Sequence, residues 1–216
     1  MAEGARPDRV IIVGQGYVGL PLAVRAVEQG HDVVGFDLDD RKIAELAAGS
    51  SYIEDIPHAR LAAALATGRY KPTSDAADLA GFDIAVISVP TPLSEGAPDL
   101  TYIESSAEQL GAHLTKGACV ILESTTYPGT TQELVAPILA KASGLEAGRD
   151  FQLGYSPERI DPGNATWTLE TTPKVVSGID APSLARVQGF YDTIVVRTVA
   201  VKSPKEAELT KLLENT

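Results

Sequence analysis

The sequence predicts an α/β fold of the Rossmann type, with a doubly wound, mostly parallel sheet and flanking helices. Apolar runs of strand length alternate with helical patterns along most of the 216 residues, as in chains built from successive βαβ units. A glycine-rich turn joins the first expected strand to the first expected helix. Polar loops rich in Ser, Thr and Pro follow several later strands, at the positions where open α/β sheets bind ligands.

The glycine-rich turn follows the apolar run 10–13 and comprises Gly14, Gln15, Gly16, Tyr17, Val18 and Gly19. At this spacing the first glycine permits the tight bend, the second lets a pyrophosphate approach the backbone, and the third lets the helix pack on the strand. The start of the helix offers free N–H groups to the phosphates, and Pro21 is tolerated there because those groups have no intrahelical partner. We therefore expect all six residues to line a dinucleotide. A strand–turn–helix without a ligand is the alternative.

An acidic residue follows the second expected strand. The apolar run 31–36 ends at Asp37, eighteen positions beyond Gly19. A carboxylate at this place accepts hydrogen bonds from the adenosine ribose and repels a 2′-phosphate, so the sequence predicts NAD as the cofactor. Arg41 and Lys42 keep NADP as the alternative, and we include Arg41 among the expected cofactor-binding residues.

The rest of the chain predicts a regular succession of elements. We expect helices at 41–48, 58–67, 76–79, 101–114, 131–142 and 183–191, and strands at 70–73, 82–89, 118–123, 151–155, 174–177 and 194–199. A last helix begins with Ser203 as N-cap, Pro204 in its first position and Glu206 completing a capping box. No capping signal precedes residue 216. We therefore expect an NAD-binding domain at 9–200 and the truncated start of a long connecting helix at 201–216.

Composition limits the classes of partner and compartment. The net charge of −11 argues against nucleic acids and anionic membranes as partners, because both require a basic face. Cys119, the single cysteine, permits no internal disulfide and fits a reducing cytoplasm. Residues 1–8 are polar, so we expect a disordered tail there and no signal peptide. No apolar run is long enough to span a membrane, and no set of metal ligands is predicted.

Five motifs occur in order along the chain. They are the turn 14–21, Val89-Pro90-Thr91-Pro92-Leu93, Glu123-Ser124-Thr125, Ser156-Pro157-Glu158-Arg159 and the closing run 207–216. In order and spacing, over all but the first eight residues, they resemble the nucleotide-sugar 6-dehydrogenases, which include the UDP-glucose and GDP-mannose dehydrogenases. The stretches 156–163 and 174–178 are most similar to the branch that acts on UDP-N-acetylglucosamine and UDP-N-acetylmannosamine.

This resemblance implies a double oxidation. The C6 alcohol of a UDP-N-acetylhexosamine, or of UDP-glucose, becomes the uronic acid in two NAD-dependent steps through a cysteine thioester, which requires a nucleophile, a cation and a proton acceptor. By resemblance, Glu158 assists hydrolysis of the thioester, and Lys211 is the cation or base beside the C6 oxygen. By the same resemblance, Asn215 is the hydrogen-bonding companion of Lys211; the two are four residues apart and share one helix face.

The resemblance places further residues at the ligands. Thr125 is expected to position a water or the nicotinamide, and Glu158 to lie near both cofactor and substrate. The remaining cofactor contacts that it implies are Val89, Pro90, Thr91 and Ser124. Simpler interpretations are a solvated loop acid at Glu158, a surface charge at Lys211, and hydroxyls that satisfy loop backbone groups at Ser124 and Thr125.

The chain departs from the family in its cysteine. The family's nucleophilic cysteine lies beyond the Lys–Asn helix in a sugar-binding domain, whereas Cys119 falls in an expected buried strand as a small core residue. We therefore expect the chain to bind NAD but not to complete the oxidation alone, and the complete enzyme to be a homodimer or larger oligomer. The NAD domain of a β-hydroxyacid dehydrogenase and a non-catalytic nucleotide-sensing module are the alternatives.

Overall fold

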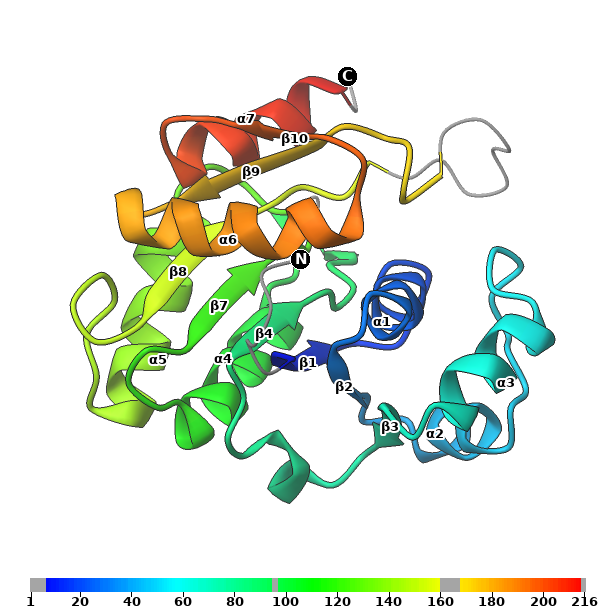
Figure 1. Cartoon of the computed structure of the whole chain (residues 1–216). Coiled ribbons are helices and arrows are strands. Elements are labelled where there is room, and N and C mark those ends of the chain that lie inside the picture. Colours follow the sequence, from blue (N-terminus) through cyan, green and yellow to red (C-terminus); the bar gives the residue numbers. More distant parts are fainter. Residues whose placement is uncertain (1–6, 95–96, 160–167, 215–216) are drawn as a thin grey trace.

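The computed structural model describes residues 7–94, 97–159 and 168–214 (Figure 1). Over this part of the chain, eight strands form one sheet in the spatial order β10-β9-β8-β7-β4-β1-β2-β3. The order turns back on itself between β1 and β4, which is the switch point of a doubly wound fold. The strands of this sheet are β1 (Arg9–Val13), β2 (Asp32–Phe36), β3 (Tyr70–Thr73), β4 (Ile84–Ile87), β7 (Cys119–Leu122), β8 (Gln152–Tyr155), β9 (Lys174–Gly178) and β10 (Thr198–Ala200). The predicted Rossmann-type fold is confirmed.

The helices pack on both faces of this sheet. They are α1 (Gly19–Glu28), α2 (Asp40–Ala47), α3 (His58–Ala66), the 3₁₀ turn η1 (Ala76–Leu79), α4 (Thr101–His113), the π turn η2 (Thr131–Val135), α5 (Ala136–Ser143), α6 (Ala181–Ile194) and α7 (Pro204–Glu214). A short hairpin of β5 (Leu93–Ser94) and β6 (Ala97–Pro98) interrupts the expected proline loop. None of the helices described combines the length and the apolarity that crossing a membrane requires.

The core consists of two apolar layers, one on each face of the sheet. Val10 and Ile12 of β1 belong to the layer that α1, α3 and α6 cover, and Ile11 and Val13 belong to the layer under α4, α5 and α7. Because both faces are covered, all four residues of β4 are buried, as in parallel sheets generally. Cys119 is completely buried in the first layer, which confirms that it is a core residue.

The strand β9 runs antiparallel to the six strands of this sheet that precede it in the chain. It pairs with β8 antiparallel, with Tyr155 opposite Ser177, and β10 runs parallel to β9. The start of β9 therefore lies at the sheet edge where β8 ends. Extended past the strand, the same register sets Lys174 opposite Glu158.

Two expected boundaries near the C-terminus are wrong. The helix expected at 183–191 is α6, Ala181–Ile194, and the strand expected from residue 194 begins only at Thr198. The helix starts early because the Asp180 carboxylate accepts a hydrogen bond from the Ser183 N–H at 2.8 Å, which is the favoured N-cap contact. It continues to Ile194 because that side chain is completely buried in the core.

The expectation of a disordered tail at 1–8 is wrong at Asp8. The Asp8 carbonyl accepts a hydrogen bond from the Asp32 N–H at 3.0 Å, and the Asp8 carboxylate pairs with Arg186 at 2.6 Å. These contacts attach Asp8 to β2 and α6. Residues 1–6 of the expected tail lie outside the described residues.

The helix α7, which lies beside β9 in Figure 1, is anchored by a buried carboxylate. Glu208 is completely buried. It accepts hydrogen bonds from the Gly129 N–H at 2.5 Å, the Thr131 N–H at 2.9 Å and the Thr131 hydroxyl at 2.7 Å. The N–H donors stand at the start of the helical run η2–α5, where free N–H groups favour a negative charge. Glu208 thereby connects α7 to the loop that follows β7.

Substitution Glu208→Ala tests this anchor. It leaves three buried donors on Gly129 and Thr131 without an acceptor, so we expect the free energy of unfolding to fall by about 2–4 kcal/mol. Urea denaturation followed by far-ultraviolet circular dichroism measures the change. The control is Glu206→Ala in the same helix, whose side chain is exposed and should cost at most about 1 kcal/mol. Equal losses in the two variants would show that Glu208 is not an anchor.

Candidate functional site

The glycine turn between β1 and α1 is packed tightly at its ends and open in its middle. Gly14 has a φ of 91°, a conformation that favours glycine, and a Cβ there would lie 2.8 Å from the Ser88 carbonyl oxygen. A Cβ on Gly19 would overlap the Gly14 carbonyl oxygen. A Cβ on Gly16 would meet no atom within 4 Å. The turn therefore leaves open space at the glycine that a pyrophosphate must approach.

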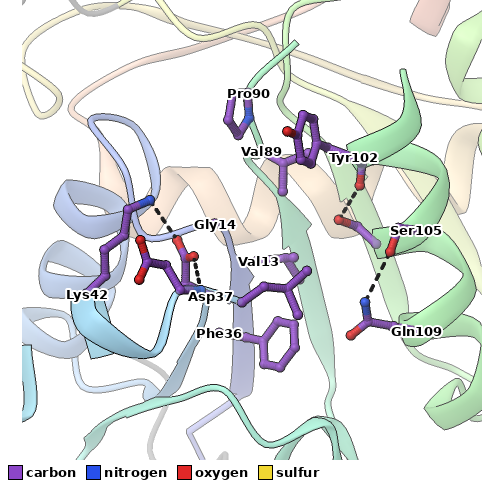
Figure 2. A pocket seen from close by; sticks show the side chains of 13 residues that line it. Val13, Gly14, Phe36, Asp37, Lys42, Val89, Pro90, Tyr102, Ser105 and Gln109 are labelled. Atoms are coloured by element: carbon purple, nitrogen blue, oxygen red, sulfur yellow. Dashed lines mark hydrogen bonds and ion pairs between the residues drawn. The ribbon is translucent and has the colours of Figure 1, made fainter. Parts of the chain in front are cut away.

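A cavity of about 410 Å³, named here the Asp37 cavity, lies beside the ends of β1 and β2. Figure 2 shows Asp37 and Lys42 on one side of it and Tyr102, Ser105 and Gln109 of α4 on the other. The full lining is Val13, Gly14, Phe36, Asp37, Leu38, Asp39, Lys42, Val89, Pro90, Tyr102, Ser105, Ser106 and Gln109.

The Asp37 carboxylate is held in a defined orientation. The Gln15 N–H donates to its Oδ2 at 2.9 Å, and the Asp39 N–H donates to its Oδ1 at 3.0 Å. Lys42 Nζ lies 3.4 Å from Oδ2. An ionised carboxylate has about four acceptor positions, so Asp37 keeps the capacity to accept hydrogen bonds from ribose hydroxyls.

A second cavity of about 490 Å³, named here the Glu158 cavity, adjoins the first. Its lining is Gly16, Tyr17, Val18, Lys42, Tyr52, Ile53, Ser88, Val89, Pro90, Thr91, Glu123, Ser124, Thr125 and Glu158. Lys42, Val89 and Pro90 belong to both linings, so the two cavities lie on either side of the loop after β4. Four of the five sequence motifs thus converge on one region, and each cavity has the size of a small-molecule site.

Two expected cofactor residues are oriented differently from the expectation. The Arg41 guanidinium pairs with Asp39 at 3.1 Å and lines neither cavity, whereas the neighbouring Lys42 lines both. The Gln15 side chain is completely buried. It donates to the Ile12 carbonyl at 2.9 Å and accepts from the Tyr70 hydroxyl at 2.7 Å. The backbone of Gln15 is also engaged, because its N–H donates to Asp37 and its carbonyl accepts from the Tyr52 hydroxyl at 2.5 Å. Gln15 therefore lines neither cavity.

Ser124 lines the Glu158 cavity, and its hydroxyl contacts loop backbone groups. Its hydroxyl donates to the Val89 carbonyl at 2.7 Å and lies 3.3 Å from the Ile87 carbonyl, so it satisfies backbone groups and holds the loop after β4 in place. Thr125 is half-buried and lines the Glu158 cavity, as does Thr91.

A buried ion cluster forms one wall of the Glu158 cavity, and the sequence did not single out its central cation. Lys174 Nζ donates to Glu158 Oε2 at 2.9 Å and to Glu123 Oε1. It also lies 5.2 Å from the centre of the Tyr191 ring. Glu158 Oε1 accepts a further hydrogen bond from the Arg159 N–H at 2.7 Å. No sequence signal could have found Lys174, because its place in the cluster depends on the antiparallel register of β8 and β9.

Burial and mutual charge set the acidity of this cluster. Burial raises the pKa of Glu123 to about 7, the charge of Lys174 opposes the rise, and the charge of Glu158 adds to it. Burial lowers the pKa of Lys174, but Glu123 and Glu158 outweigh that effect and hold it above its ordinary value. Lys174 is therefore an ammonium ion throughout the neutral pH range.

The structure describes only some of the remaining residues that were expected to take part in catalysis. Lys211 lies half-buried on α7 and does not line the Glu158 cavity. Asn215 lies outside the described residues, so its pairing with Lys211 stays a prediction. Burial raises the pKa of the Cys119 thiol to about 12, which makes it unsuitable as a nucleophile.

The residues present fit a dinucleotide. Gly16 leaves space for the pyrophosphate, α1 begins directly after the turn with its free N–H groups, and Asp37 stands where the adenosine ribose belongs. The two adjoining cavities have room for the two halves of the molecule. Within the described ranges, no group of three or more His, Cys, Asp or Glu side chains is arranged to hold a metal ion.

Curated proteins similar in sequence to this chain include a nucleotide-sugar dehydrogenase. The chain is 40% identical over 209 residues to Protein CapL of Staphylococcus aureus, covering 96% of the chain and 48% of CapL. It is 41% identical over 211 residues to UDP-N-acetyl-D-glucosamine 6-dehydrogenase of Pseudomonas aeruginosa, covering 96% of the chain and 49% of that protein. The chain spans about half the length of the curated relatives it matches.

Solved structures agree with this relationship. The UDP-D-ManNAc dehydrogenase of Pyrococcus horikoshii superposes with a TM-score of 0.91 at 34% identity, covering 96% of this chain and 50% of that one. A ternary complex of GDP-mannose dehydrogenase from Pseudomonas aeruginosa gives a TM-score of 0.88 at 30% identity, with coverages of 96% and 49%. Residues 8–195 match the NAD binding domain of the UDP-glucose/GDP-mannose dehydrogenase family. The chain therefore belongs to this family and contains its NAD-binding domain.

Proposed function

We propose that this chain is the NAD-binding part of an enzyme that oxidises the C6 alcohol of a UDP-N-acetylhexosamine to the uronic acid in two NAD-dependent steps. The observation that carries the proposal is the convergence of Gly16, Thr125 and Glu158 on one cavity that adjoins the Asp37 cavity. In this proposal, the Glu158 carboxylate and the Thr125 hydroxyl lie beside one end of a dinucleotide bound across the glycine turn. When bound, NAD supplies the acceptor for the two electrons that leave C6 with its hydrogen.

The two cavities divide the cofactor between them in this proposal. The adenosine half occupies the Asp37 cavity, where the carboxylate binds the ribose hydroxyls. The pyrophosphate lies over Gly16 at the start of α1, and the nicotinamide half occupies the Glu158 cavity. The shape of the turn supports this placement, because Gly14 and Gly19 are closely packed while Gly16 faces open space.

Glu158 is the proposed proton acceptor for hydrolysis of the thioester. Lys174 and the Arg159 N–H hold its two carboxylate oxygens at 2.9 Å and 2.7 Å, so the carboxylate is oriented before a ligand arrives. Thr125 is the proposed hydroxyl that positions a water or the nicotinamide. Lys211 and Asn215 are proposed at the C6 oxygen. The cysteine that carries the thioester must come from outside this chain, because Cys119 is buried in the core.

The substrate class is part of the proposal. Relatives at 41% and 39% identity, from Pseudomonas aeruginosa and Salmonella typhi, are UDP-N-acetyl-D-glucosamine 6-dehydrogenases. A relative at 34% identity, from Pyrococcus horikoshii, is a UDP-N-acetyl-D-mannosamine dehydrogenase. These similarities favour a UDP-N-acetylhexosamine over UDP-glucose.

We also propose that the complete enzyme works in the cytoplasm as a homodimer or larger oligomer. The single cysteine, buried and without a disulfide, suits a reducing compartment. Leu209, Leu212 and Leu213 of α7 are exposed, and a second copy of the enzyme is the proposed cover of this apolar surface.

The role of Asp37 predicts a preference for NAD over NADP. We expect calorimetry on this chain to show clearly weaker binding of NADP, because the carboxylate repels a 2′-phosphate. Asp37→Asn should weaken NAD binding about tenfold, the size of one lost charged hydrogen bond, and should narrow the preference between the two cofactors. The exposed neighbour Asp40 provides the control, since Asp40→Asn should change neither affinity. Unchanged affinities in Asp37→Asn would remove Asp37 from the ribose site.

Because its single cysteine is buried, we predict that the chain alone does not catalyse the complete NAD-dependent oxidation. With saturating NAD and UDP-N-acetylglucosamine or UDP-N-acetylmannosamine, we expect no sustained formation of NADH by absorbance at 340 nm. Cys119→Ser should behave in the same way, because the Cys119 thiol is buried. Steady turnover by the unmodified chain would refute the claim that the nucleophile lies elsewhere.

A further inference from the structure

Three ionisable side chains from separate parts of the chain meet at the wall of the Glu158 cavity. Glu123 follows β7, Glu158 follows β8, and Lys174 begins β9. Their exposed fractions are 1%, 9% and 3%. We call these residues the buried trio. Glu123 and Glu158 line the cavity, and Lys174 lies between them.

The buried trio contains two acidic side chains and one basic side chain. Two carboxylates and one ammonium ion give a net charge of −1, in a place where burial makes an uncompensated charge costly. Glu123 Oε1 receives the Lys174 ammonium group, but Glu123 Oε2 is buried and accepts no hydrogen bond from any described residue. A proton on Oε2 would neutralise the trio and convert this orphaned acceptor into a donor. The geometry therefore provides room for one exchangeable proton.

We assign the exchangeable proton to Glu123, because its Oε2 is the carboxylate oxygen of the buried trio that has no hydrogen-bond partner among the described residues. Tyr191 of α6 and Tyr155 of β8 face it, and burial raises the pKa of both phenols, so they stay neutral. The Arg159 side chain donates to the Pro173 carbonyl at 3.2 Å, and Lys42, which lines the same cavity, pairs with Asp37 at 3.4 Å. The raised pKa of Glu123, about 7, agrees with this assignment.

We propose that the buried trio selects the oxidised cofactor by its charge: it favours NAD⁺ over NADH when Glu123 is ionised, and loses this preference when Glu123 is protonated. The proposal rests on the placement of the nicotinamide half in the Glu158 cavity. The nicotinamide ring of NAD⁺ carries a positive charge, and that of NADH carries none. A charge of −1 in the cavity wall attracts only the first.

This coupling between the charge of the nicotinamide ring and the protonation of Glu123 also assists the oxidation. When the C6 alcohol becomes an aldehyde, the C–H bond breaks and its electron pair passes with the hydrogen to the nicotinamide, while the O–H proton is released. The ring thereby loses its positive charge, so Glu123 holds a proton more tightly than before. The base at the C6 oxygen, proposed above as Lys211, receives and passes on the proton of the alcohol, and the uptake of one proton by Glu123 compensates this release, so charge and atoms balance.

The proposal predicts a pH-dependent ratio of affinities. Glu123 loses its proton as pH rises through about 7, so binding of NAD⁺ should strengthen relative to NADH. Between pH 6 and pH 8.5 we expect the ratio of the two affinities, measured by calorimetry on this chain, to rise about tenfold, as for one unit charge several ångströms away in a protein site. Glu123→Gln keeps the shape of the side chain and an oxygen facing Lys174, and should abolish the rise.

The controls separate this effect from other titrations. ADP-ribose shares the adenosine and diphosphate but lacks the nicotinamide, so its affinity should not follow the trend and should be equal in Glu123→Gln if that variant is folded. Glu108→Gln, an exposed substitution on α4, should retain the full rise. If all ligands bind but the ratio is constant, or rises equally in Glu123→Gln, the charge proposal is wrong and the cofactor site stands. If neither NAD⁺ nor NADH binds, the proposed function fails as well.

Discussion

The close contact between the glycine turn and the end of β4 is the constraint on which the site depends. The Ser88 hydroxyl donates to the Val13 carbonyl at 2.9 Å and lies 3.2 Å from the Gly14 carbonyl. Gly14 and Gly19 are so close to Ser88 and to each other that a Cβ on either would collide. This packing places the start of α1 directly above the switch point of the sheet. The Asp37 and Glu158 cavities open on either side of it.

The second organising feature is the reversal of β9. Because β9 is antiparallel to β8, its first residue reaches the sheet edge that otherwise collects only the ends of strands. Lys174 is thereby buried between two carboxylates. A buried ion pair is weak evidence for stability, since the cost of removing charges from water often exceeds their attraction. In the proposal made above, the position of the buried trio on the wall of the Glu158 cavity gives a functional reason for this cost.

Local features of the site were predictable because neighbouring residues create them. The turn 14–19 and Asp37 each follow directly from a strand, so their placement requires only that the strand form. Side-chain direction was not predictable in the same way. Gln15 turns inward because Gly35 leaves space for it: a Cβ on Gly35 would lie 2.5 Å from Gln15 Oε1. Arg41 and Lys42 are adjacent in sequence, yet only Lys42 reaches the cavities, because successive helical residues point in different directions.

The sequence by itself determined the fold class, the glycine turn, the position of Asp37 after the second strand and the family motifs at the strand ends. These depend on local spacing and on apolar periodicity, which a chain carries in its order of residues. The tertiary structure alone decided the direction of β9, the meeting of Glu123, Glu158 and Lys174, and the anchoring of α7 by Glu208. Those contacts join residues up to 79 positions apart. An apolar run predicts that a strand is buried but not which strand it pairs with or in which direction, because a buried strand has the same pattern in either orientation.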